Sequence, residues 1–96
     1  MTQLLTIDIG TTSTKVVCYS QTGAVLASAN HGYPLIQTAP DMAEEDPDVI
    51  VAAVKQGISE VTAQVNGPID GLSFSAAMHS LILLDTHRRP LTRMYT

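Results

Sequence analysis

Apolar residues in the first third of the chain form short runs that alternate with tight polar turns. Residues 4–9, 14–20 and 24–31 are rich in apolar and branched side chains, and each run has the length of a β-strand. The connections at 10–13 and 21–23 are short, and each contains a glycine. This pattern predicts three consecutive antiparallel strands, a meander that begins a larger mixed sheet.

The middle of the chain changes to a helical period. Asp46-Pro47-Asp48 is a typical helix start, with an aspartate N-cap, a proline in the first turn and a further acid. Asn66-Gly67-Pro68 ends the pattern. Glycine inside a helix costs up to about 1 kcal/mol relative to alanine, so Gly57 is expected to mark a close approach to the sheet. The apolar stripe between these limits is formed by Ile50, Val54, Ile58, Val61 and Val65, with Ala53 and Gly57 beside it.

Two further apolar runs, at residues 69–75 and 81–85, follow the helix and are predicted to be strands. The predicted order is βββαββ, an α/β arrangement of about five strands in a mixed sheet with one long helix. Residues 36–45 contain Pro40 and several acids without periodicity, and they predict an ordered surface loop. A single helix covers one face of a sheet, so the other face, expected to be aliphatic, is predicted to need a partner.

Composition narrows the class of protein. The chain has 96 residues, enough for one modest domain, and its net charge of −4 leaves no basic stripe for nucleic acid. No apolar run approaches the ~18 residues of a membrane span, and no signal peptide is recognised, so the cytoplasm is the expected compartment. The single cysteine, Cys18, excludes an internal disulfide and is predicted to be a buried, inert thiol.

The turn after the first strand carries candidate chemistry. Asp8 ends a buried strand, Gly10 permits close backbone approach and positive φ, and hydroxyls follow at positions 11–14 before Lys15. Amides, hydroxyls and an ammonium group suit a polyphosphate, and a carboxylate suits its Mg²⁺. A threonine-rich hairpin turn with an exposed lysine explains the same spacing equally well. The β-branched residues after Lys15 argue against a helix there, and so against a P-loop.

Two other polar groups admit a structural and a functional interpretation. Met78 and His79 follow a predicted strand, where loops of open sheets often bind ligands. Taken alone, the pair is better explained as a connector in which methionine fills core space and histidine is solvated. The acids between the third strand and the helix are interpreted as a solvated charged loop in preference to a cation site. These acids are Asp41, Glu44, Glu45 and Asp46.

Residues 7–15, IDIGTTSTK, resemble the first phosphate-binding hairpin of the actin-like ATPase superfamily. The sequence of this segment is most similar to that of the FGGY carbohydrate kinases. Met78-His79 with residues 81–85 resembles the sugar-site segment of FGGY pentulose and gluconate kinases. Residues 42–47 resemble the Trp-x-Glu-x-Asp-Pro helix start of the family. Met42 stands where tryptophan is usual and Ala77 where glutamine is usual, which puts in doubt any hydrogen bond of that glutamine.

The resemblance, over residues 7–92, implies a partial ribonuclease-H-like domain. Residues 1–96 would be the N-terminal portion of the first kinase domain, with the second domain absent. The implied activity is transfer of the γ-phosphate of MgATP to a hydroxyl of gluconate or a pentulose such as xylulose. The general base, an aspartate, is expected downstream, so the fragment alone is expected to be inactive. The implied site consists of Asp8, acting on Mg²⁺ through water, Gly10, Thr11, Thr12, Ser13 and Lys15 at the ATP phosphates, and Met78 and His79 at the sugar.

Two alternatives to a sugar kinase stay open. One is another actin-like ATPase or kinase, such as an acetate-kinase-like or glucokinase-like protein. The other is a non-catalytic module that binds nucleotide or acts as a scaffold. The expected partners are a small sugar or sugar acid and the rest of the kinase chain, without nucleic acid or membrane. A homodimer of the parent protein is compatible with the sequence.

Overall fold

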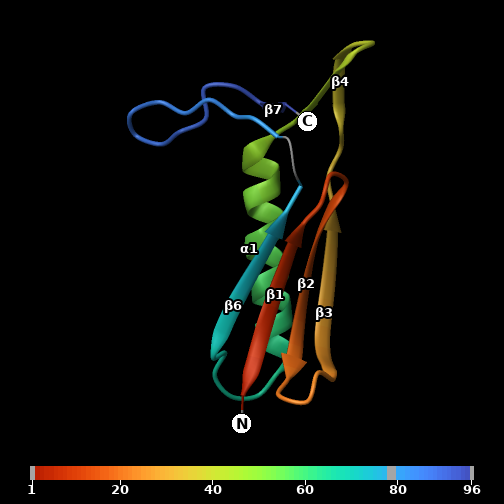
Figure 1. The fold of residues 1–96 in the computed structure, drawn as a ribbon, viewed down its shortest axis with the longest axis vertical. Helices are drawn as coiled ribbons and strands as arrows, with labels where there is room; N and C mark the ends of the chain where they lie inside the picture. The colour runs from red at the N-terminus through yellow and green to blue at the C-terminus, as the bar shows by residue number, and fades with distance from the viewer. Residues whose placement is uncertain (1, 78–79, 96) are drawn as a thin grey trace.

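The main sheet is built around its first strand. The computed structural model describes residues 2–77 and 80–95. Strand β1 (Gln3–Ile9) pairs antiparallel with β2 (Ser13–Ser20), and β2 pairs antiparallel with β3 (Val25–Gly32). Figure 1 shows these three strands side by side. The predicted meander is confirmed.

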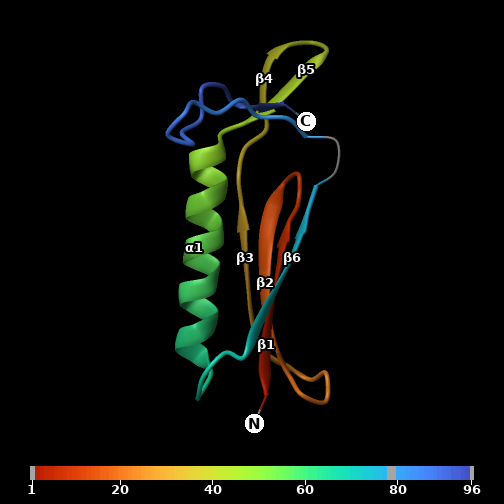
Figure 2. The ribbon, with the colours of Figure 1, turned by 60° about the vertical axis from the view of Figure 1, so that its left-hand side comes forward.

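A single helix carries the chain across this sheet. Helix α1 (Pro47–Gln64) packs against one face and leads to β6 (Gly71–Ala76), which pairs parallel with β1. Figure 2 shows the helix and the sheet as two layers. A parallel pair needs such a crossover, and it brings the carboxyl ends of β1 and β6 to the same edge. The α/β class, the mixed sheet and the single long helix are confirmed.

The two ends of α1 have the predicted chemistry. Asp46 is the N-cap, and its Oδ1 accepts a hydrogen bond of 2.9 Å from the backbone N–H of Asp48. After the helix, Gly67 takes a positive φ of 89°.

The buried side of the helix is formed by Ile50, Ala53, Gly57 and Val61. The main core between helix and sheet is formed by Leu5, Ile7, Val16, Cys18, Ala27 and Val61, so the expectation of a buried Cys18 thiol is confirmed.

Residues 36–45 are not the loop that the sequence predicted. They form a hairpin of β4 (Ile36–Ala39) and β5 (Met42–Glu45), and β7 (Met94–Tyr95) completes a second sheet of order β4-β5-β7. This sheet projects beyond the end of the main sheet (Figure 1). The prediction missed it because its strands have only four residues each and pair with an irregular register, so they show no clear alternation, and because β5 also pairs with β7, which is far away in the sequence.

Residues 81–85 are also not a fifth strand of the main sheet, which has four strands among the described residues. They form only isolated bridges, between Leu81 and Tyr95 and between Leu84 and Pro90. Asp85 turns the chain, because its Oδ1 accepts hydrogen bonds from the backbone N–H groups of His87 and Arg89. The segment therefore folds back on the residues that follow it.

The acidic residues of β5 are buried, which corrects the expectation of a solvated loop. Glu44 is 8% exposed and accepts a hydrogen bond of 3.3 Å from Nη1 of Arg93. Glu45 is fully buried, and within the described part of the chain neither of its carboxyl oxygens has a hydrogen-bond partner. This burial raises the pKa of Glu45 above its ordinary value of 4.5.

Apolar side chains are exposed on the α1 side of the sheet as well as on the predicted face, where Leu4 of β1 is 44% exposed. Leu72 and Phe74 of β6 lie beside Leu5 and Ile7 in the parallel register, so they face the α1 side of the sheet. The helix does not cover them, and they are 57% and 59% exposed. Leu72 lines an open apolar hollow of about 440 Å³ between α1 and β6. The face away from α1 is mixed, with polar residues such as Asp8 on β1.

Substituting Gly57 with alanine should destabilise the fold. A Cβ at this position would lie 2.7 Å from Cγ2 of the fully buried Val16, a stiff β-branched side chain. Overpacking of this kind costs about 1–3 kcal/mol, more than the gain in helix propensity of about 1 kcal/mol. Urea unfolding followed by circular dichroism should show the loss. Ser59→Ala, at an exposed position of α1, is the control and should cause no comparable loss.

Replacing Glu45 by glutamine should flatten the dependence of stability on pH. Because the pKa of Glu45 is raised in the folded state, the folded chain binds its proton more tightly than the unfolded chain. Stability should therefore fall as pH rises from about 4.5 to the raised value, with a slope of at most about 1.4 kcal/mol per pH unit. Thermal unfolding between pH 4 and 8 should show this slope in wild type and lose it in Glu45→Gln. An equal loss in Asp41→Asn, an exposed position, would contradict the assignment.

Candidate functional site

The turn between β1 and β2 is short and exposed, and a hydrogen bond within its own backbone joins its two ends. The N–H of Gly10 donates a hydrogen bond of 2.8 Å to the carbonyl oxygen of Ser13, and Thr11 and Thr12 are exposed between them. Gly10 does not use the positive φ that the sequence suggested. Its hydrogen side chain is needed for space, because a Cβ there would lie 3.0 Å from the Ser13 oxygen.

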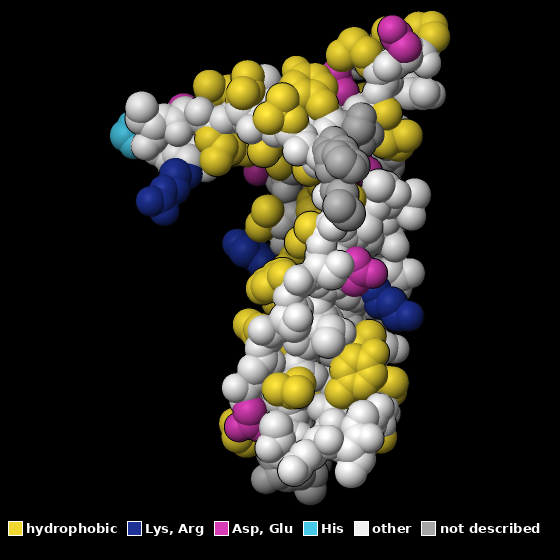
Figure 3. Space-filling view, in the orientation of Figure 1, with side chains coloured by type: hydrophobic (Ala, Val, Ile, Leu, Met, Phe, Trp, Pro, Cys, Tyr) yellow, Lys and Arg dark blue, Asp and Glu magenta, His cyan; other side chains and the backbone are white. Residues whose placement is uncertain are grey.

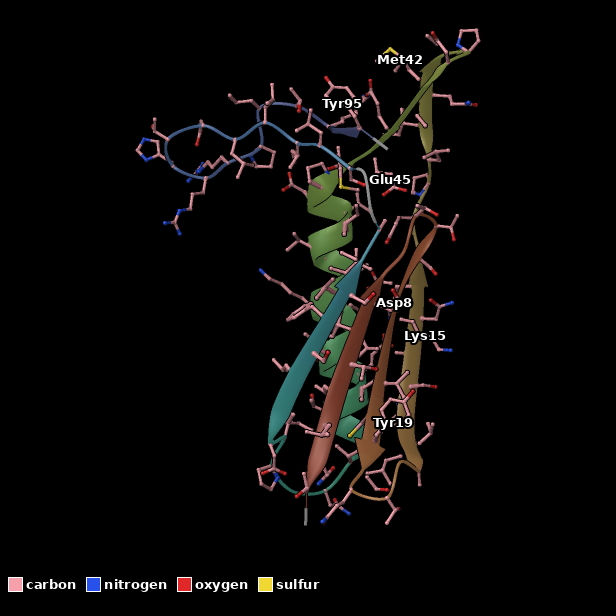
Figure 4. All side chains as sticks on the ribbon, in the orientation of Figure 1. Asp8, Lys15, Tyr19, Met42, Glu45 and Tyr95 are labelled. Atoms are coloured by element: carbon pink, nitrogen blue, oxygen red, sulfur yellow. The ribbon has the colours of Figure 1, made fainter. Side chains whose placement is uncertain are left out.

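Asp8 and Lys15 flank this turn on neighbouring strands. They are direct partners in the β1–β2 register, and both are exposed. Asp8 alternates with the core residue Ile7, so it lies on the face turned away from α1. Figure 4 labels both residues, and in the space-filling view of the same face acidic and basic side chains are neighbours there (Figure 3). A carboxylate and an ammonium group therefore share one face of the sheet, next to the exposed residues of the turn.

One predicted hydroxyl does not belong to the exposed set. Thr14 is fully buried, and its Oγ1 lies 3.3 Å from the phenol oxygen of Tyr33. Tyr33 also donates from its phenol to the carbonyl oxygen of Gly10, at 2.5 Å, and from its backbone N–H to that of Thr12, at 3.0 Å. Sequence reasoning missed Tyr33, because Tyr33-Pro34 signals only the end of a strand.

Asp8 can supply only one of the several ligands that a magnesium ion needs. Among the described residues no group of three or more His, Cys, Asp or Glu side chains could hold a metal. Mg²⁺ keeps several of its waters and is commonly held by one or two carboxylates together with substrate phosphates. A single exposed carboxylate at the edge of an amide-rich turn suits that mode, in which the nucleotide brings the metal.

The second predicted group begins at the same edge of the sheet. Met78 and His79 lie outside the described residues. The N–H of Ala77 donates a hydrogen bond of 2.8 Å to the carbonyl oxygen of Ile9, which extends the parallel ladder of β1 and β6 by one step. The chain therefore leaves β6 directly beside the residue that leads into the 10–13 turn.

Within residues 2–77 and 80–95, no helix combines the length and hydropathy needed to cross a membrane. Two hollows of the surface lie toward the other end of the sheet, where Gln3 and Asp70 are among the lining residues. The turn itself is exposed at Thr11 and Thr12.

Comparisons with known proteins agree with this arrangement. Residues 3–96 match the sequence pattern of the FGGY family of carbohydrate kinases, N-terminal domain. A gluconokinase of Bacillus subtilis (strain 168) is 43% identical over 94 residues, which cover 97% of this chain and 18% of that protein. A xylulose kinase of the same organism is 35% identical over 94 residues, covering 95% of this chain and 19% of the relative.

A solved structure shows the same fold. The crystal structure of gluconate kinase from Lactobacillus acidophilus superposes with a TM-score of 0.95 at 43% identity, covering 99% of this chain and 19% of that chain. The chain thus spans about a fifth of the length of the proteins it matches. With the sequence pattern, the identity and the fold in agreement, the chain belongs to the FGGY family of carbohydrate kinases, to whose N-terminal domain it corresponds.

Proposed function

We propose that this domain is part of an ATP-dependent kinase that transfers the γ-phosphate of MgATP to a hydroxyl of gluconate or of a pentulose such as xylulose. The observation that carries the proposal is the exposed 10–13 turn with Asp8 and Lys15 paired beside it. Support for the substrate class comes from the relatives named gluconokinase and xylulose kinase.

The turn would serve the phosphate end of the nucleotide. The backbone of Gly10 and the exposed groups of Thr11, Thr12 and Ser13 would surround the phosphates, and Lys15 would add a positive charge. Bound Mg²⁺ would neutralise charge on the phosphate oxygens, and Asp8 would orient it through water. Phosphoryl transfer depends mainly on such positioning and charge stabilisation, so these residues need no covalent role.

The sugar would bind at the edge shared by β1 and β6. Met78 and His79 are proposed to contact it, with His79 hydrogen-bonded to a hydroxyl and not acting as a base. The bond from Ala77 to Ile9 supports this proposal, because it brings the chain to that edge just before these two residues. The general base, an aspartate, and the adenosine pocket would come from the remainder of the kinase. In this view residues 1–96 form only part of the first domain.

Substituting Asp8 with asparagine should remove most of the activity. The amide keeps the size of the side chain but loses the charge that would orient hydrated Mg²⁺. We expect kcat/KM of the complete protein to fall by roughly 10²–10³, the usual cost of removing one electrostatic group. Isothermal titration of MgATP into the domain should show weaker binding than in wild type. Asp41→Asn serves as the control, and an effect of the same size there would argue against a specific role for Asp8.

Residues 1–96 alone should show no sugar-dependent release of ADP, because no general base is proposed within them. The complete protein should phosphorylate gluconate or xylulose in a coupled assay, with glycerol as a poor substrate. Sugar-dependent turnover by the 96-residue chain would refute the first expectation. Binding of MgATP without turnover on any sugar by the complete protein would favour a non-catalytic nucleotide-binding module.

A further inference from the structure

Tyr33 holds the turn at three points. Its backbone N–H donates to the carbonyl oxygen of Thr12, and its phenol donates to that of Gly10 and lies 3.3 Å from Oγ1 of Thr14. A phenol has one proton, so when that proton goes to Gly10 the Thr14 hydroxyl must donate to the phenol oxygen. One side chain and its own backbone thus fix the beginning, middle and end of the segment 10–14.

Strand pairing with β1 and β3 holds Ser13 and Thr14, but it does not reach the loop residues between Gly10 and Ser13. Its own backbone supplies the bond from the Gly10 N–H to Ser13, and its exposed residues Thr11 and Thr12 lie outside the strands. An anion site of backbone amides depends on N–H groups that already point to one place before the ligand arrives. The carbonyl oxygens of Gly10 and Thr12 set the peptide planes that carry those N–H groups. The residue that binds these two oxygens therefore controls the direction of the amides.

Tyr33 is itself held from several sides. It is 8% exposed, and it belongs to a second core cluster with Ile50 and Ala53 of α1, against which Ile9 and Met94 pack. Burial raises its pKa above the ordinary value of 10, so the phenol stays protonated at neutral pH and remains a donor. A side chain locked by packing is suited to position its neighbours.

We propose that Tyr33 is a positioning residue that holds the 10–14 turn in its phosphate-binding shape without touching the nucleotide. The inference rests on the proposed function, since MgATP is taken as the ligand of the turn. The shape of the turn then depends on a buried residue after β3, which in turn packs against α1.

The test compares two tyrosine-to-phenylalanine variants. Tyr33→Phe keeps the ring and removes both phenol hydrogen bonds. Tyr19→Phe makes the same chemical change on β2, at the far end of the hairpin from the turn (Figure 4). We expect the Kd for MgATP to rise about three- to tenfold in Tyr33→Phe, the usual effect of one or two lost hydrogen bonds, and to stay within twofold in Tyr19→Phe. Amide hydrogen exchange should accelerate at residues 10–14 only in Tyr33→Phe.

A second variant covers the case in which Tyr33→Phe fails to fold. Thr14→Val removes the hydroxyl that bonds the phenol while keeping the volume of the side chain, and should raise the Kd in the same direction by less. In the complete protein, KM for ATP should rise in both variants with KM for the sugar unchanged, a split that general loss of stability would not give.

The outcomes separate the two proposals. Unchanged exchange at residues 10–14 together with an unchanged Kd in Tyr33→Phe would overturn the positioning role. Absence of MgATP binding by wild type would refute the proposed function instead. The exchange rates of the turn would then still decide whether Tyr33 holds it.

Discussion

The parallel pairing of β1 with β6 is the constraint on which the rest of the domain depends. Parallel neighbours cannot be joined by a tight turn, so the chain must cross a face of the sheet, and α1 makes that crossing. Because both strands run in one direction, Ile9 and Ala77 meet at one edge. The topology thus places the end of β6 beside the residue that leads into the 10–13 turn.

The packing of α1 transmits this constraint to the turn. Gly57 lets the helix approach Val16 so closely that no side chain fits between them. That contact sets the position of the helix over β2 and β3, and the N-terminal half of the helix then presents Ile50 and Ala53 to Tyr33. Core packing and the shape of the candidate site are thus parts of one arrangement. A change in the contact between Gly57 and Val16 would shift Tyr33 and, with it, the shape of the turn.

Features with a clear signal in the residues around them were predictable from the sequence, and features without one were not. The N-cap at Asp46 follows from the residues beside it, and a glycine inside a helical pattern predicted the close approach at Gly57; the structure confirms both. The predicted loop at 36–45 was wrong because its two four-residue strands pair irregularly and show no clear alternation. The predicted strand at 81–85 was wrong because its bridges depend on residues 90–95. Tyr33 was missed for the same reason, since its partners lie about twenty positions earlier and no periodic pattern connects them.

The two outer strands of the main sheet differ in how they meet solvent. The β2–β3 pairing contains an irregularity between Cys18 and Tyr19, and such bulges twist an edge away from regular pairing. Strand β6 keeps an unbroken register with β1, and its outer edge has no neighbouring strand among the described residues. With Leu72 and Phe74 exposed along it, this edge is a template to which another extended chain can add. The strand that brings Ala77 to the candidate site is thus also the place where the domain, handled by itself, is open to aggregation.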